Sequence, residues 1–94
     1  MFIVYCRDGE GRHELRKEVR PRHIDYLKQS AGILCSAGPQ IGPDGNAFGG
    51  LFILNVGNRE AAEQWTKADP MAKADVYDRI EIAEWKHLLG SGIG

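Results

Sequence analysis

Six segments with a regular hydrophobic spacing follow one another along this chain, and their order leaves few folds open. Apolar or β-favouring runs at 2–6, 33–37, 48–56 and 76–85 have the character of strands. They enclose two segments with helical spacing, at 13–30 and 58–70. Two strand–helix–strand units joined by a hairpin predict an α+β domain of ferredoxin-like βαββαβ topology. In that fold a four-stranded antiparallel sheet carries both helices on one face.

The first helical segment contains one residue that disturbs its pattern. Its apolar stripe recurs every four residues and consists of Leu15, Val19, His23 and Leu27. Pro21 lies within that stretch. The sequence leaves open whether Pro21 kinks this helix or starts a second one after a break. Further on, Asn58 is expected to cap the second helix, and the segment 38–46, rich in Gly and Pro, is expected to be a loop.

Two of the strand segments are apolar on both faces. In the segments 2–6 and 48–56, side chains alternate between two faces. One face carries Phe2, Val4, Phe48, Phe52 and Leu54, and the other carries Ile3, Tyr5, Leu51 and Ile53. Two helices cover only one face of a sheet, so the second face needs another layer. A second copy of the chain would supply it, which predicts a homodimer or a higher oligomer. Alternatively, these residues line a ligand pocket, and the two interpretations are compatible.

Composition excludes several classes of function. The 12 Lys+Arg nearly balance the 13 Asp+Glu, whereas nucleic-acid-binding proteins usually have a net basic surface. The N-terminus has no basic leader, and no apolar run approaches the roughly 20 residues of a membrane helix. We therefore expect one cytoplasmic domain over residues 1–94, with a flexible tail from about residue 87 and no nucleic-acid or membrane partner.

The cysteines and histidines do not suggest a metal or redox site. Cys6 and Cys35 fall on strands that this topology separates by a third strand. Two strand spacings come to about 9.5 Å, beyond the roughly 7 Å limit for a disulfide. We expect both thiols to be free, buried and inert. Three scattered histidines have no zinc spacing, so neither a metal nor a cofactor is expected.

His23 and Asp69 are the candidate catalytic residues. His23 lies on the apolar stripe of its helix, and Asp69 closes the next helix, where the helix dipole disfavours a carboxylate. Each has an ordinary explanation as well, His23 as a core residue and Asp69-Pro70 as the start of a short turn at 71–74. Because both helices lie on one face of the sheet, the two side chains can meet. A carboxylate beside an imidazole fixes its tautomer and favours its charged form, which gives an acid–base group.

Four other residues are weaker candidates for ligand binding. Ser36 could donate a hydrogen bond, although an ordinary strand serine is the more frequent case. Arg22 could bind a substrate carboxylate, although most such arginines are surface residues. Tyr5 and Phe48 could form walls of a pocket or belong to the core.

Three segments together resemble the YCII-related family. They are Arg20–Leu27, Ala37-Gly38-Pro39 and Ala68–Tyr77, and the similarity extends over nearly the whole domain. The family's two hallmark polar positions match His23 and Asp69. The resemblance implies a dimeric α/β barrel with a His–Asp dyad in a cleft, and one family relative is a dehydrochlorinase of a chlorinated hydroxymuconate. This chain differs in having Asp75 where glycine is usual and a short loop between the second and third strands.

Three hypotheses for function follow. The first is a small cofactor-independent enzyme of the lyase or isomerase type, of which the dehydrochlorinase is one example. In it His23 moves a proton and Asp69 orients the imidazole. The second is a non-catalytic ligand-binding or regulatory dimer that recognises a small organic acid in the same pocket. The third, from analogy of fold alone, is a cofactor-free monooxygenase.

Overall fold

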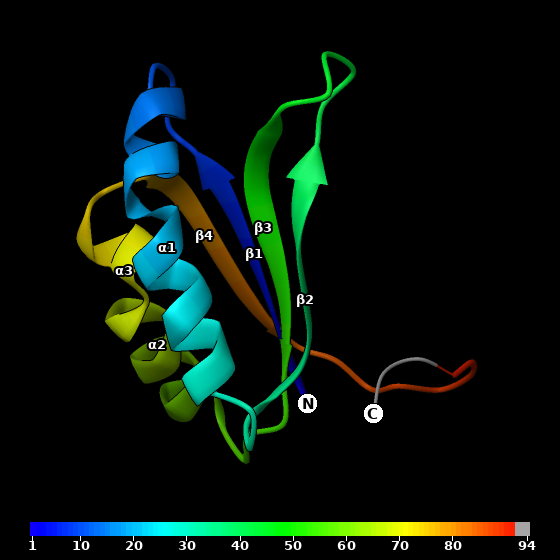
Figure 1. Cartoon of the computed structure of the whole chain (residues 1–94). Coiled ribbons are helices and arrows are strands. Elements are labelled where there is room, and N and C mark those ends of the chain that lie inside the picture. Colours follow the sequence, from blue (N-terminus) through cyan, green and yellow to red (C-terminus); the bar gives the residue numbers. More distant parts are fainter. Residues whose placement is uncertain (92–94) are drawn as a thin grey trace.

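A four-stranded antiparallel sheet with its helices on one face makes up the protein (Figure 1). The computed structural model describes residues 1–91. Its elements are β1 (Phe2–Asp8), α1 (His13–Gln29), β2 (Leu34–Ile41), β3 (Ala47–Leu54), α2 (Arg59–Ala68), α3 (Pro70–Lys73) and β4 (Tyr77–Glu84). The strand order is β2-β3-β1-β4, which confirms the predicted ferredoxin-like arrangement.

Helix α1 runs unbroken past Pro21. Proline lacks an N–H, so the carbonyl four residues earlier loses its helical partner. That carbonyl belongs to Lys17, and both residues are exposed, so water can take the place of the missing donor. The helix therefore does not restart at Pro21. Its predicted inner stripe is confirmed, since Val19 and His23 are buried against the sheet.

The boundaries of β2 differ from the prediction. The strand continues through Gly38 and Pro39 to Ile41, so the predicted loop begins four residues too early. Pro39 pairs with Gly50 of β3, and within residues 1–91 no strand pairs with the other side of β2. An edge strand tolerates proline because the missing N–H is not needed on the open side. The remaining turn is short and reverses at Gly45, whose φ of 83° suits glycine.

A side chain caps the N-terminus of each of the two helices that follow β3. The Asn58 side chain accepts a hydrogen bond from the Ala61 N–H at 2.8 Å, which confirms the predicted cap of α2. Asp69 ends α2 and begins α3, where it accepts from the Met71 N–H at 3.0 Å and Pro70 follows in the first turn. The chain therefore turns sharply at Asp69 and fixes that carboxylate at the junction of the two helices.

The two faces of the sheet are covered unequally. The core lies between the helices and the inner face, and it is built on Phe2, Val4, Cys6, Val19, Phe52, Leu54, Ala62, Trp65, Met71, Val76 and Tyr77. The strand register places Ile3, Tyr5, Leu51 and Ile53 on the other face. Within residues 1–91 no helix covers that face, and Leu51 is 36% exposed.

Both cysteines are free, as predicted. Strand β3 separates Cys6 on β1 from Cys35 on β2, also as predicted, but only Cys6 is buried. Cys35 lies on edge strand β2 beside a register shift, and this leaves it half-buried. The prediction that Cys35 is buried is wrong.

No helix among residues 1–91 is both long and apolar enough to span a bilayer. After β4 the chain leaves the domain (Figure 1). Leu88 and Leu89 of this segment are strongly exposed. The flexible tail stays a prediction, and its residues 92–94 lie outside the part described.

Candidate functional site

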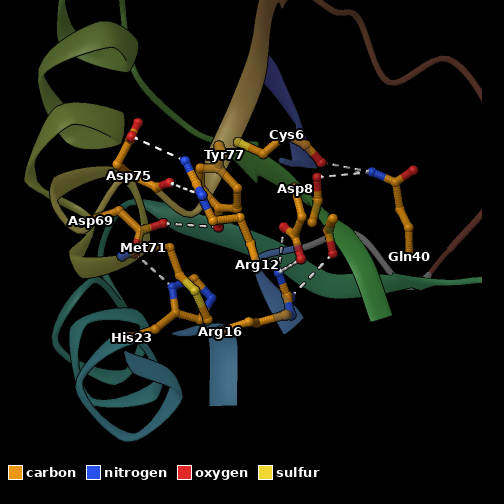
Figure 2. Close-up of polar contacts among 12 residues, drawn as sticks. Cys6, Asp8, Arg12, Arg16, His23, Gln40, Asp69, Met71, Asp75 and Tyr77 are labelled. Atoms are coloured by element: carbon orange, nitrogen blue, oxygen red, sulfur yellow. Dashed lines mark hydrogen bonds and ion pairs between the residues drawn. The ribbon is translucent and has the colours of Figure 1, made fainter. Parts of the chain in front are cut away.

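His23 on α1 and Asp69 at the junction of α2 and α3 face each other across the helix layer (Figure 2). Their Nδ1 and Oδ1 atoms are 2.7 Å apart. Both side chains are buried, with His23 5% and Asp69 1% exposed. Because a carboxylate only accepts, His23 donates through Nδ1–H, and the neutral ring then has its lone pair on Nε2.

Asp69 is held in place by three donors. Besides His23, it accepts from the Met71 backbone N–H at 3.0 Å and from the Tyr77 hydroxyl at 3.4 Å (Figure 2). The two explanations offered for Asp69 therefore hold together, because one oxygen atom serves both as the helix cap and as the partner of the imidazole. A carboxylate fixed in this way can set the orientation of the His23 ring.

Two ionisable neighbours of Asp69 stay protonated. Burial, with the Asp69 charge as the second cause, raises the pKa of the Tyr77 hydroxyl far above its usual range. The same two causes raise the pKa of the Cys6 thiol to about 12. Tyr77 therefore remains a hydrogen-bond donor to Asp69 at physiological pH, and Cys6 remains an unreactive thiol.

A small cavity lies beside His23. Its volume is about 130 Å³, and it is lined by Arg16, Arg20, His23, Ile24, Leu27, Ala37, Gly38, Pro39, Gly50, Phe52 and Met71. Nε2 of His23 has no hydrogen-bond partner among residues 1–91, yet it is not sealed in the packing. Nε2 is therefore the polar atom that the imidazole offers to this space. The Phe52 ring meets the imidazole edge-on at 5.8 Å and forms an apolar wall.

Arg16 is a buried charge that the sequence did not reveal. Its guanidinium binds both oxygens of Asp8 at 2.8 and 3.0 Å and donates to the Gly49 carbonyl at 3.2 Å. Burial raises the pKa of the Asp8 carboxyl, and the Arg16 charge opposes that rise. Its position in the sequence could have indicated this burial, because Arg16 precedes His23 by two helical turns and so lies on the same face of α1.

The four weaker candidates do not line the His23 cavity. Ser36 and Tyr5 lie on the opposite face of the sheet, where their strand partners are Ile53 and Leu51. Phe48 lies at the far end of β3, with the Arg7 guanidinium 5.6 Å from its ring centre. Arg22 is exposed on α1. A ligand role for any of the four stays a prediction to which this cavity lends no support.

The arginine one turn before His23, rather than the one next to it, reaches the cavity. Arg20 is exposed and lines it, whereas Arg22 does not. Helical spacing could have distinguished them, because residues three apart share a face and adjacent residues do not. Over residues 1–91, no group of three or more His, Cys, Asp or Glu side chains is placed to hold a metal ion.

Comparisons with known proteins agree with this description. The family model of the YCII-related domain matches residues 1–86. Protein YciI of Escherichia coli O6:H1 is 31% identical over 95% of this chain and 99% of its own length. An uncharacterised protein of Haemophilus influenzae is 27% identical over 94% and 98%.

One solved structure has a similar fold. It is the 5-chloro-2-hydroxyhydroquinone dehydrochlorinase TftG from Burkholderia phenoliruptrix AC1100, in complex with 2,5-dihydroxybenzoquinone. It superposes with a TM-score of 0.84 at 23% identity and covers 92% of this chain and 93% of that one. The similarity supports the ferredoxin-like α+β fold expected from the sequence. The chain belongs to the YCII-related family.

Proposed function

We propose that this protein is a small enzyme that transfers a proton to and from an organic substrate, with His23 as the acid–base group. One observation carries the proposal: His23 binds Asp69 through Nδ1 at 2.7 Å and leaves Nε2 free beside a cavity. A general base must have a lone pair within reach of the substrate proton, and Nε2 meets that requirement. Asp69 does not touch the cavity, so it acts by orienting the ring and stabilising the imidazolium.

Elimination is one reaction that this arrangement can support. Nε2 takes a proton from the substrate, the electron pair left behind forms a new double bond, and chloride departs with the electrons of the carbon–chlorine bond. The imidazolium then returns its proton to water. A positioned base of this kind accelerates a reaction by roughly 10²- to 10⁴-fold. TftG, a dehydrochlorinase on a similar fold, supports the choice of this reaction as the first to test.

The test is chloride release from 5-chloro-2-hydroxyhydroquinone by the wild type and four variants. We expect His23→Gln to lower kcat by about 100-fold or more. Asp69→Asn should lower it by a smaller factor, because the ring remains but its orientation is lost. The matched controls are His13→Gln and Asp25→Asn, which change exposed residues of the same helix.

Two results would contradict the proposal. Turnover that survives His23→Gln would remove His23 from the chemistry. Saturable binding of 2,5-dihydroxybenzoquinone without turnover of any chlorinated or enolic substrate would favour the second hypothesis, a ligand-binding dimer.

We also propose that two copies of the chain pair through the uncovered face of the sheet. The residues Ile3, Tyr5, Leu51 and Ile53 give that face an apolar centre, and Ile53 is 7% exposed although it lies outside the helix-side core. Sedimentation at micromolar concentration should give a dimer. Leu51→Glu should give a monomer. Ile80→Glu should not, because Ile80, which is 43% exposed, lies on the helix-bearing face. A monomeric wild type would contradict this pairing.

A further inference from the structure

Two arginines reach the cavity beside His23, and their situations differ. Arg16, Arg20 and His23 occupy one face of α1, at successive turns. Among the residues that the structure describes, no aspartate or glutamate lines the cavity. The charge of this space therefore depends on whether each guanidinium is already neutralised.

Arg16 is neutralised within the protein. Its side chain is 10% exposed, it binds Asp8 through two oxygens, and it donates to the Gly49 carbonyl. Turning Arg16 toward a ligand would leave the buried Asp8 carboxylate without its partner, which is strongly unfavourable. Arg16 therefore forms part of the wall and does not bind the ligand's charge.

Arg20 has no such partner. It makes no hydrogen bond or ion pair with any residue of 1–91. Its helical neighbours three and four residues away are Arg16, Lys17, His23 and Ile24, none of which is acidic. By contrast, Lys17 has Glu14 at 4.0 Å. The five donors of the Arg20 guanidinium are therefore available at the opening of the cavity.

The remaining walls restrict the size of the ligand. They are apolar residues, chiefly Phe52, Leu27 and Met71 together with Ala37, Gly38 and Pro39 of β2. The volume of about 130 Å³ is below the roughly 300–1,000 Å³ of pockets for drug-sized ligands. A compound of about one ring fits this space, with its apolar body inside and a charged group outside.

We infer that the substrate is a small anionic compound of about one ring, and that Arg20 binds its anionic group and so determines specificity. This inference rests on the proposed function, since it assigns the ligand of the same cavity. The anion would lie on Arg20, one turn from His23, which places the body of the ligand beside Nε2. Planar carboxylates and enolates match the fork of a guanidinium.

The test compares two ligands of equal shape, benzoate and benzamide, with 2,5-dihydroxybenzoquinone as a second anion. Calorimetric titration of the wild type should show binding of both anions and at least tenfold weaker binding of benzamide. Arg20→Gln should raise the Kd of the anions about tenfold or more and remove most of their preference over benzamide. Lys28→Gln, which removes an exposed cation of α1 away from the cavity, should leave Kd within twofold.

Salt provides a second measurement. Raising NaCl from about 0.05 M to about 0.5 M should weaken anion binding by the wild type but barely affect Arg20→Gln, because screening acts on the charge that the variant lacks. Arg20→Lys should recover part of the affinity, since it keeps the charge without the fork.

Three results would overturn the inference: no saturable binding of either anion, equal affinity for benzoate and benzamide, or an equal loss in Arg22→Gln and Arg20→Gln. These results are distinct from failure of the proposed function, which is read from kcat. Anion binding that depends on Arg20, in a protein whose turnover does not need His23, would keep the ligand class and reject the mechanism.

Discussion

Helix α1 carries two buried ion pairs that are alike in burial and distance but differ in chemistry. Arg16–Asp8 and His23–Asp69 lie two turns apart, each with a shortest N–O distance below 3 Å. Arg16 directs its guanidinium to Asp8 and to a backbone carbonyl of β3. His23 uses one ring nitrogen and keeps the other free beside the cavity.

The comparison shows that burial and pairing alone do not identify a site. Both pairs meet those two criteria and both cationic residues line the cavity, but only His23 can present a lone pair there, because a guanidinium has no acceptor. A second difference concerns protonation. Arginine cannot lose its proton in a protein, whereas histidine can, so the two pairs should respond differently when their carboxylate is removed. Four predictions test the comparison between the two pairs.

The largest effect is expected for Asp8→Ala. It strands the Arg16 guanidinium in the protein interior and should lower the free energy of unfolding by about 3–5 kcal/mol, measured by urea titration. Asp78→Ala, which removes an exposed carboxylate of β4, should change it by less than about 0.5 kcal/mol. The double variant Asp8→Ala with Arg16→Met should recover most of the loss. Equal effects of the two aspartate substitutions would show that Arg16 does not need Asp8.

A smaller effect is expected for Asp69→Asn. Asparagine can still cap α3, and its side-chain oxygen can still accept a hydrogen bond from His23, so we expect a loss of about 1–3 kcal/mol. The same urea titration measures it, at the same protein concentration. A loss larger than that of Asp8→Ala would reverse the comparison and mark Asp69 as primarily structural.

Alkaline pH should affect the two ion pairs differently, because within residues 1–91 the Tyr77 hydroxyl donates a hydrogen bond to Asp69 and none to Asp8. Its folded pKa lies above its ordinary value of 10.0, so the protonated hydroxyl is favoured by folding. This stabilisation is complete below the unfolded pKa and is lost as pH rises through and beyond 10.

The urea midpoint of the wild type should therefore fall between pH 8 and pH 11, and that of Tyr77→Phe should fall less steeply. At pH 7 the variant should lose only about 0.5–1.5 kcal/mol, the value of one hydrogen bond. An equally steep fall in Tyr77→Phe would contradict the buried, protonated hydroxyl.

The smallest effect is expected at the cysteines. Cys6 lies within electrostatic reach of both carboxylates, and its pKa is raised to about 12. A thiol reagent at pH 8 should therefore modify Cys35 alone in the native protein and both cysteines in urea, with no change in stability from the single modification. Rapid modification of Cys6 in the native protein, mapped by mass spectrometry, would show that solvent reaches the protein interior near the two ion pairs.

Sequence patterns were sufficient for the order of elements and for the inner stripe of α1, because both depend on hydrophobic spacing. They failed at β2, where Gly38 and Pro39 suggested a loop but lie in an edge strand that tolerates them. They also missed Arg16, since the spacing rule counts apolar residues and a charge becomes buried only if a distant carboxylate meets it. Arg20 and Arg22 could have been separated by helical geometry alone.

The central claim is that Asp69 holds the His23 ring with its proton on Nδ1 and its lone pair on Nε2, facing the cavity. Long-range ¹H–¹⁵N spectroscopy of the histidine side chains measures this tautomer directly, without a substrate. The account predicts that neutral His23 carries its proton on Nδ1 in the wild type and that Asp69→Asn shifts the ring toward the Nε2–H form, while His13 stays unchanged. A wild-type His23 protonated on Nε2, or a tautomer unaffected by Asp69→Asn, would contradict it.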